Sequence, residues 1–450
     1  MKSEKPIVKN GKVLKRVIIG AVCAVLFVAS FFAGYFFRDV TNPEMASLRF
    51  IVETYKKYYL EESDDFVSIM GNSIVDRYSE YMTKEEYLAV VNASIGRRNG
   101  IGISYDRTNL SISSVKGNSP AEKAGLKAGD VITGVKKASD TDFINISDSD
   151  ALVSAFDKIG DGETFSLRVN SLGEEKICDL AFCEYQEAYV FYKDSVGDYR
   201  FQDSEGKEMS FIGYEYESGN PELANDAAYI KYSSFIGRGN EKKVGSSAWQ
   251  MKTALEKFKS DKKTKLILDL RGNGGGYMDI LENVASHFIC AKNGSEKLVS
   301  KAVYKDGKED RFVSDSVDYE DYGFEKIIIL ANTGTASASE ALIGAILDYD
   351  SNGIVSVVLS ASLVADGNNE TSYVYRSYGK GIMQTTYVNP VLGDALKLTT
   401  AKIYWPVSEI TIHGTGVSKN SCAVYADRIY EPTYEENVDY ELKKAISLLR

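Results

Sequence analysis

The sequence predicts a multi-domain α/β protein, and three observations along the chain support this. An uninterrupted apolar run lies near the N-terminus, short strand-like runs separated by turns follow, and from about residue 227 buried strands alternate with helices. Such alternation is typical of α/β folds with a parallel sheet. A chain of 450 residues is long enough for roughly three domains. We therefore expect an N-terminal transmembrane helix, a helical segment, a β-rich domain and an α/β core.

The composition limits the classes of function. The chain has a net charge of −11 and a pI of about 5.1, so its electrostatics give no support to a nucleic-acid partner. It contains five cysteines and two histidines, His287 and His413, without any CxxC or Cys/His metal spacing. We therefore expect no metal site, no other cofactor and no nucleic-acid partner.

The N-terminal segment predicts a membrane anchor. Residues 1–16 are rich in lysine and arginine, and residues 17–37 contain no charged side chain. A helix of that length spans about 32 Å, enough for the core of a bilayer. The positive-inside rule then places residues 1–16 in the cytoplasm and the rest of the chain outside a single-pass span of the cytoplasmic membrane. A cleaved signal peptide is the alternative, although this apolar run exceeds a typical signal h-region.

Two segments follow the predicted anchor. Residues 45–95 are expected to be helical, because "LRFIVETYKKYYLEE" and "VDRYSEYMTKEEYLAVV" space their apolar side chains as helices do. In residues 96–185, "NGIGISYD", "LSISSV", "DVITGVKK" and "TFSLRVNS" predict strands, and "NSPAEKAGLKAG" and "SDSDALVSAFDKIG" predict a turn and short helices. This second segment is therefore expected to be a small β-rich domain.

The order of elements in residues 96–185 resembles a PDZ domain. In that family, free backbone N–H groups of one loop bind a peptide C-terminal carboxylate, and the following strand pairs with the peptide. The resemblance assigns this loop to Gly100, Ile101, Gly102 and Ile103. A different small β-rich domain is the alternative.

Residues 186–450 are expected to form the α/β core. The tyrosine-rich residues 186–226 predict one or two hairpins inserted at its start. "AAYIKYSSF", "TKLILDLRGNGGG" and "KIIILANTG" then predict strands, and "SSAWQMKTALEKFKSD" and "YMDILENVASHFI" predict helices. Since strands of a parallel sheet end at one edge, the loops after these strands are expected to meet in a site.

Two of these strand ends have side chains and amides suited to nucleophilic catalysis. "ILDLRGNGGG" supplies backbone N–H groups in Gly272–Gly276 that suit an oxyanion, and "ANTGTASASE" presents hydroxyls at a helix N-terminus. A nucleophilic serine needs a base, and with histidine scarce the candidate is Lys380 in "SYGKGIMQTT". A lysine acts as a base only when neutral, which requires burial or a cationic neighbour. Taken alone, the hydroxyl-rich stretch is also explained by a capping box and packing of small residues.

The motifs "DLRGNGGG", "GTASASEALIGAILD", "GKGIMQ" and "TTAKIYWP…TIHGTGVSKN" stand in the order found in the C-terminal processing (tail-specific) peptidases. The chain resembles this family from about residue 46 to its end. These are membrane-anchored or secreted serine proteases with a Ser/Lys dyad and without a cofactor. The resemblance implies Ser337 as nucleophile, Lys380 as general base and Gln384 as its orienting partner. It also implies an oxyanion hole formed by the backbone N–H of Ala338 and one N–H of residues 274–276, taken here as Gly275.

The resemblance implies a function as well. We expect a membrane-tethered serine endopeptidase that captures unfolded or regulatory proteins by their apolar C-termini through the PDZ domain. The sequence leaves open whether the chain forms a homo-oligomer. Asp269 and Arg271 are expected to support the glycine loop as an ion pair, since a buried strand end seldom carries both charges unpaired. His287 is expected to pack within a helix, and His413 to belong to a strand-turn motif.

One departure from the family concerns the dyad. Lys380 follows Ser337 at a longer distance than is customary, Ser362 stands at the usual position, and residues 361–378 are the extra segment. A surface insertion costs only modest loop entropy, so the site can survive it. Two alternatives stay open: a catalytically inactive PDZ-containing binding or scaffold protein at the membrane, and a hydrolase that uses His413 as its base.

Overall fold

The computed structural model divides the chain into two compact units, residues 1–88 with 384–400, and residues 89–383 with 401–450. The residues that the structure describes are 25–26, 30, 42–59, 76–160, 162–193, 199–202, 207–211, 223–237, 245–289, 296–314, 322–365, 371–435 and 438–450.

The predicted membrane span, residues 17–37, lies outside the described residues except for Val25, Leu26 and Ser30. In the helices that the structure describes, none is both long and apolar enough to cross a membrane. The anchor therefore stays a prediction.

Among its described residues, the smaller unit contains a helix, a short strand and most of a β-hairpin. Helix α2 (Pro43–Tyr58) starts with a proline and is capped by the side chain of Asn42. Strands β21 (Ile382–Val388) and β22 (Ala395–Tyr404) pair with each other. The core of this unit joins the helix to the hairpin and consists of Tyr55, Tyr59, Leu396 and Leu398.

The prediction that residues 45–95 are helical is wrong at Glu80–Met82. These residues form strand β1 and pair antiparallel with β22, with Met82 buried against the unit. Over three residues, hydrophobic spacing cannot distinguish a helix from a strand, so the pairing partner decides. Helix α4 (Lys84–Ser94) then follows as expected and leads into the larger unit.

Within the larger unit, the predicted β-rich segment has a hydrophobic core of its own, which includes Ile101, Leu152 and Leu167. A four-stranded antiparallel sheet runs in the order β6-β5-β7-β8, and β3 and β2 pair with β4 and β9. The elements are β2 (Arg97–Gly100), β3 (Ile103–Tyr105), β4 (Ile112–Val115), α5 (Pro120–Lys123), β5 (Val131–Lys137), β6 (Ile144–Asn145), α6 (Ser149–Phe156), β7 (Thr164–Ser171), β8 (Glu174–Ala181) and β9 (Cys183–Gln186). The β-rich fold is confirmed, while its PDZ character stays a prediction.

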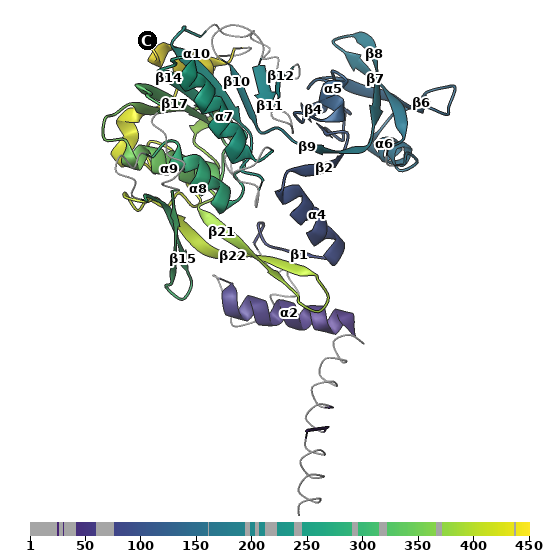
Figure 1. The fold of residues 1–450 in the computed structure, drawn as a ribbon, viewed down its shortest axis with the longest axis horizontal. Coiled ribbons are helices and arrows are strands. Elements are labelled where there is room, and N and C mark those ends of the chain that lie inside the picture. The colour runs from purple at the N-terminus through teal and green to yellow at the C-terminus, as the bar shows by residue number, and fades with distance from the viewer. Residues whose placement is uncertain are drawn as a thin grey trace, which may run out of the picture. The chain divides into compact units, whose positions relative to one another are not determined.

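The α/β core is built on an eight-stranded sheet in the order β12-β11-β10-β13-β14-β17-β18-β23 (Figure 1). The strands from β13 to β23 are parallel, and β10, β11 and β12 continue the sheet in antiparallel fashion. They are β10 (Val190–Lys193), β11 (Tyr199–Gln202), β12 (Glu208–Phe211), β13 (Ala227–Tyr232), β14 (Lys265–Asp269), β17 (Lys326–Ala331), β18 (Val355–Leu359) and β23 (Ile429–Tyr430). The hairpins expected in residues 186–226 are therefore part of this sheet.

Helices cover both faces of the sheet. Helices α7 (Ser247–Ser260), α8 (Met278–Ser286) and α9 (Ala338–Tyr349) pack on one face through the alternate residues of β13, β14 and β17 (Figure 1). Helix α10 (Tyr440–Leu448) packs on the other face against the remaining residues of the same strands. Because both faces are buried, the central strands are mostly apolar, as the sequence predicts for a parallel sheet, with Lys231 and Asp269 as charged exceptions near their carboxyl ends.

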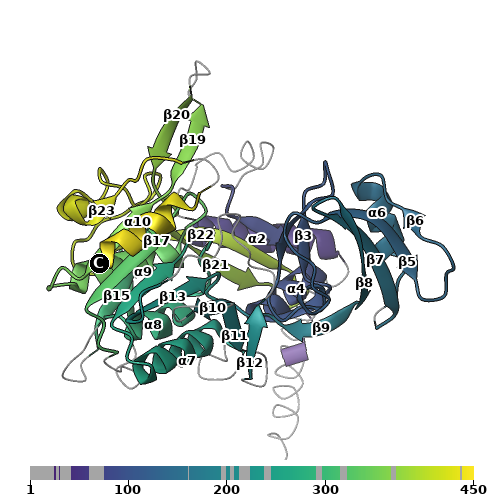
Figure 2. The same ribbon diagram turned by 90° about the horizontal axis from the view of Figure 1, so that it is seen from above.

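The remaining elements of the larger unit border this sheet. Strand β15 (Leu298–Tyr304) pairs with β16 (Glu309–Val313) and with the last residues of β22. A 3₁₀ helix covers Ala423–Arg428 before β23. Strands β19 (Ala361–Ala365) and β20 (Thr371–Tyr375) form a separate hairpin, which projects from the core (Figure 2).

Candidate active site

Ser337 occupies a sharp turn between strand β17 and helix α9. Its backbone has φ 59° and ψ −120°, and helix α9 begins at the next residue. A positive φ is rare for a residue with a side chain, and such strain gathers at functional sites. The turn leaves Ser337 half-buried at the helix N-terminus. The N–H of Ala338 has no acceptor among the described residues, so it is available to an oxyanion.

The glycine loop after β14 lies directly against this turn. A Cβ placed on Gly275, where φ is 95°, would lie 2.7 Å from the Ser337 Cβ and 2.9 Å from the Ala338 nitrogen. The Asn273 carbonyl accepts the Ala336 N–H at 2.9 Å, which ties the loop to the turn. Only glycine fits at position 275, so the close approach of the two loops explains why one residue of the glycine-rich loop must be glycine.

The amide of Gly275, the predicted oxyanion donor beside Ala338, has a hydrogen-bond partner in the structure, so its role stays a prediction. Its N–H donates to the Asn273 side-chain oxygen at 2.9 Å and is therefore already in use. The neighbouring N–H of Gly274 has no acceptor within the described part of the chain. Of the two amides, Gly274 is thus the one available beside Ala338. The sequence does not indicate a role for Asn273, because an asparagine within a glycine-rich loop is typical of an ordinary turn.

The carboxylate of Glu340 joins the serine turn to the lysine segment. Its Oε2 accepts the backbone N–H of Ser337 and that of Lys380, both at 2.9 Å. The two amide nitrogens therefore lie within twice that distance of each other. Its Oε1 accepts the Gly379 N–H at 2.8 Å and the Ser377 hydroxyl. The structure thus brings together two of the residues that the sequence analysis selected.

Glu340 is fully buried, and this burial raises the pKa of its carboxyl group, while the hydrogen bonds from Ser377, Gly379, Ser337 and Lys380 oppose the shift. All four neighbours donate, so only the ionised carboxylate satisfies them. The sequence signal for this residue is the S-x-x-E pattern of a capping box, in which the glutamate accepts the first amide of the helix. That pattern does not reveal the further bonds to residues 377–380.

The extra segment between Ser337 and Lys380 does not separate the two loops. Its hairpin closes where Ala361 pairs with Tyr375, so the chain returns to its starting point. The Tyr378 N–H then donates to the Thr335 carbonyl at 2.9 Å, beside the serine turn. The additional residues are therefore accommodated outside the site, as expected for a surface insertion.

The other hydroxyls near Ser337 bind the loops around it. Thr335 donates to the Leu270 carbonyl at 2.8 Å, and Ser339 donates to the Asn273 carbonyl at 3.0 Å. Thr333 lies 3.1 Å from the hydroxyl of Ser362. These contacts account for the hydroxyls of Thr333, Thr335 and Ser339 at this helix start. None of the three contacts involves the hydroxyl of Ser337.

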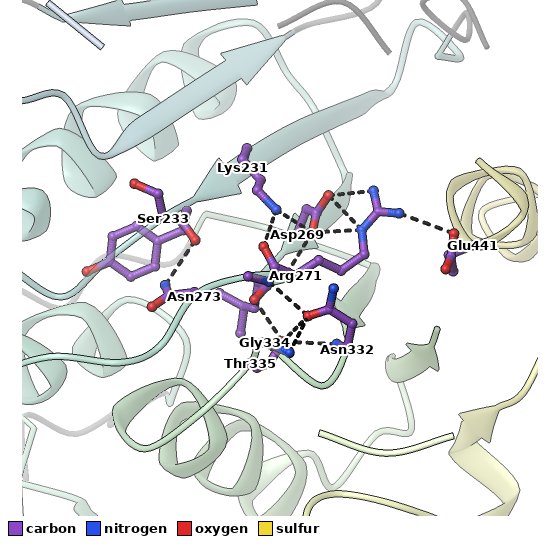
Figure 3. Close-up of polar contacts among 12 residues, drawn as sticks. Lys231, Ser233, Asp269, Arg271, Asn273, Asn332, Gly334, Thr335 and Glu441 are labelled. Carbon is purple, nitrogen blue, oxygen red and sulfur yellow. Dashed lines mark hydrogen bonds and ion pairs between the residues drawn. The ribbon is translucent and has the colours of Figure 1, made fainter. Parts of the chain in front are cut away.

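An ion-pair network lies behind the glycine loop (Figure 3). Arg271 contacts Asp269 with Nη2 2.6 Å from Oδ2, and Lys231 lies 3.1 Å from Asp269 Oδ1. Asp269 is fully buried, which by itself raises its pKa, but Arg271 and Lys231 hold that pKa well below its usual value. The expectation that Asp269 and Arg271 support the loop as an ion pair is confirmed.

His413 lies in a turn as expected, whereas His287 is the C-cap of α8 and not a residue inside the helix. His287 is buried, and its Nδ1 lies 3.0 Å from the Tyr322 hydroxyl. His413 is exposed in a turn whose backbone packs on the glycines beside Lys380, since a Cβ on Gly381 would lie 2.7 Å from the His413 nitrogen. Within the described residues, no cluster of His, Cys, Asp and Glu could hold a metal ion.

Gln384 belongs to the smaller unit, on strand β21. Its Nε2 lies 3.4 Å from the Thr399 hydroxyl, a contact inside that unit. Its role as the orienting partner of Lys380 stays a prediction.

The predicted carboxylate-binding loop lies between β2 and β3. The carbonyls of Ile101 and Gly102 accept the N–H groups of Ala121 and Lys116 at 2.9 and 2.8 Å. The N–H groups of Ile101 and Gly102 have no acceptor among the residues described. Gly100 and Gly102 have φ values of 136° and 80°, conformations that favour glycine. Ile103 begins the strand that would pair with a peptide.

Comparisons with known proteins agree with the motifs. Residues 226–356 match peptidase family S41. The "Probable CtpA-like serine protease" of Staphylococcus aureus (strain bovine RF122 / ET3-1) is 26% identical over 423 residues, which cover 89% of this chain and 69% of that protein. The protein of the same name from Staphylococcus saprophyticus is 26% identical over 433 residues, covering 92% of this chain and 71% of that protein.

Among solved structures, the photosystem II D1 C-terminal processing protease is similar, with a TM-score of 0.43 and 20% identity over 88% of this chain and 89% of that chain. The match to the S41 family includes the glycine loop and Ser337, and the sequence relatives extend over most of the chain. The chain is therefore similar to peptidase family S41 over residues 226–356, and over most of its length to CtpA-like serine proteases.

Proposed function

We propose that the chain is a serine endopeptidase in which Ser337 is the nucleophile and Lys380 the general base. The observation that carries this proposal is the Glu340 carboxylate, which binds the backbone N–H of both residues at 2.9 Å. A nucleophile and a base must be held within reach of each other, and a shared buried anchor does this for their backbones. The serine peptidase relatives support the same reaction.

The proposed reaction uses groups of this chain alone. The Ser337 Oγ attacks the carbonyl carbon of the peptide bond while neutral Lys380 takes its proton. The oxyanion that forms accepts the N–H groups of Ala338 and Gly274. When the C–N bond breaks, Lys380 passes the proton to the leaving amine, and an acyl-enzyme remains. Water, deprotonated by Lys380, then hydrolyses the ester and regenerates Ser337.

Substrate capture is proposed to occur at the PDZ-like segment. The N–H groups of Ile101 and Gly102, which have no acceptor in the described part of the chain, suit a terminal carboxylate, and the edge of β3 suits pairing with an extended peptide. Proteins with apolar C-termini, unfolded or regulatory, are the proposed substrates. Gln384 is proposed to orient Lys380. A membrane anchor at residues 17–37 would hold the peptidase outside the cytoplasmic membrane.

The alternative of an inactive scaffold is not favoured. It requires the insertion to pull Lys380 away, whereas the hairpin closes on itself and Glu340 binds both loops. A base at His413 is not proposed either, because this side chain is exposed and no contact links it to Ser337 among the described residues.

Cleavage of an unfolded protein that ends in apolar residues tests the proposal. The full-length chain is expected to cut it, Ser337→Ala is expected not to, and a substrate whose C-terminus is amidated is expected to be cut more slowly with a raised KM. Equal cleavage of the amidated substrate would refute capture through the carboxylate. Cleavage that persists in Ser337→Ala would refute the nucleophile.

A further inference from the structure

The start of helix α10 is connected to the glycine loop through Arg271. Asp439 caps α10, since its Oδ1 accepts the Leu442 N–H at 3.0 Å. The same carboxylate binds Arg271, with Nη1 2.7 Å from Oδ1 and Nη2 3.0 Å from Oδ2. A cap needs only one acceptor, Oδ1, so the bond from Arg271 to Oδ2 is additional to the cap.

Arg271 is in turn fixed on its other side. Its Nε lies 3.1 and 3.0 Å from the two oxygens of Asp269, and its own N–H donates to Asp269 at 2.8 Å. Lys231 donates to the Arg271 carbonyl. Both the backbone and the guanidinium of the residue that precedes Gly272 are therefore held, and the glycine loop starts from a fixed point (Figure 3).

Asp439 fixes the orientation of the Arg271 guanidinium as well as neutralising its charge. Asp439 binds Nη1 and Nη2 in a two-point contact, while Glu441 reaches only Nη1 at 3.3 Å. The side chains of Arg271, Asp439 and Glu441 are all close to buried, with 11%, 8% and 9% exposed. A two-point contact fixes the plane of the guanidinium, which a single point charge does not.

The next residue of the helix reaches the other side of the site. The Tyr440 hydroxyl accepts the N–H of Ala361, the first residue of β19, at 2.9 Å. The hydroxyl of the following residue, Ser362, lies 3.1 Å from that of Thr333, in the loop that leads to Ser337. The N-cap and the first residue of α10 thus contact Arg271, which precedes the glycine loop, and the first residue of β19, whose neighbour Ser362 contacts the loop that leads to Ser337.

We propose that Asp439 is a positioning residue for the peptidase reaction, which acts through Arg271 to hold the glycine loop against Ser337. The proposal rests on the proposed function and adds to it that the C-terminal helix determines the oxyanion geometry. Because Asp439 would act through Arg271 and not on the substrate directly, its removal should lower kcat and leave KM unchanged. A misplacement of about 1 Å at a distance from the chemistry can reduce a rate by about 100-fold.

Asp439→Asn isolates this role, because asparagine still caps the helix through its oxygen but presents an NH₂ group to Arg271. With a fluorogenic peptide and the full-length chain, we expect kcat to fall between about 10- and 100-fold at unchanged KM. Glu435→Gln is the matched control, since this exposed residue of the same region pairs with Lys443 at 2.8 Å and not with Arg271, and it should match the parent. An unchanged kcat in Asp439→Asn would overturn the proposal.

A double-mutant cycle with Arg271→Lys tests whether the effect travels through the arginine. The Arg271→Lys variant cannot make the two-point guanidinium contact. In that variant, Asp439→Asn should lower kcat less than about twofold. Equal losses of kcat in both backgrounds would show that Asp439 acts independently of Arg271. That result would overturn the proposal, whether or not the variants differ in unfolding temperature. Absence of hydrolysis by the parent would instead refute the peptidase assignment itself.

Discussion

At the scale of single residues, the site depends on a buried acid that takes no part in the bond chemistry. Glu340 stands at the third position of α9, where a glutamate ordinarily satisfies the helix start. Here it also accepts two amides and a hydroxyl from residues 377–380. One carboxylate thus holds the two segments together. This contact maintains the strained backbone of Ser337, and it keeps Lys380 beside Ser337 despite the long spacing in the sequence.

Glu340→Gln should therefore disable the site with little change in shape. The amide NH₂ would face two N–H donors, or an N–H and a hydroxyl, and each unsatisfied buried donor costs about 1–3 kcal/mol. We expect kcat to fall at least 100-fold and the free energy of unfolding to fall by a few kcal/mol. Peptide hydrolysis and urea unfolding measure the two effects.

Asp348→Asn is the control for Glu340→Gln. Asp348 lies at the far end of the same helix and accepts the N–H groups of Val407 and Ser408 at 2.8 and 2.9 Å. The Asp348→Asn variant should have a lower free energy of unfolding and an unchanged kcat. If both variants lost kcat in proportion to their stability, Glu340 would have a purely structural role.

Gly275→Ala tests the contact between the glycine loop and the serine turn. The added methyl would meet the Ser337 Cβ at 2.7 Å, so the loop must move away, and with it the Gly274 N–H that we propose as an oxyanion donor. Loss of an oxyanion donor costs about 100- to 1,000-fold in kcat. Gly272→Ala is the comparison, since φ there is 74° and nothing lies within 4 Å of the added atom. Comparable losses in both variants would mean that backbone strain, and not the clash, is responsible.

At the scale of elements, the sequence predicted most strands and helices of the core but not all of their neighbours. Strand β14, strand β17 and helix α9 follow from apolar runs that end in glycine and hydroxyl loops. The pairing of Glu80–Met82 with β22 joins segments far apart in the chain, which local spacing does not encode. For the same reason, the bonds from Glu340 to residues 377–380 and from Asp439 to Arg271 could not be predicted: each depends on where two distant loops meet.

The β19–β20 hairpin should be dispensable for peptide hydrolysis. Its ends pair at Ala361 and Tyr375, and its contact with the serine loop is made at Ser362. Replacing residues 363–373 with an Asn-Gly turn keeps these residues and the short connection. We expect kcat for a short peptide within about threefold of the parent, and a stability loss of about 1 kcal/mol from the stack of Tyr373 on Tyr434. A collapse of kcat at full folding would mean that the hairpin shapes the site.

At the scale of the whole molecule, stability depends on pH through the ion-pair network behind the loop. The pKa of Asp269 lies well below its usual value because Arg271 and Lys231 stabilise its charge, although burial opposes this. The unfolded chain binds a proton at this residue below about pH 4, while the folded chain does not. The stability that Asp269 contributes is therefore fully present above about pH 4 and is lost as the pH falls below that value.

Urea unfolding between pH 6 and pH 3 tests this linkage. The parent should lose stability steeply below about pH 4, and Asp269→Asn, less stable at pH 6, should show a shallower decline. Parallel curves for the two proteins would contradict the low pKa of Asp269.

Reaction of the full-length chain with a fluorophosphonate, which modifies activated serines, tests the central claim most directly. The parent, Ser337→Ala and Lys380→Ala are compared by adduct mass, by the modified peptide and by rate. The account predicts one adduct on Ser337, none in Ser337→Ala, and a rate at least about 100-fold lower in Lys380→Ala. An adduct on another serine, or an unchanged rate in Lys380→Ala, would contradict a Ser337/Lys380 pair.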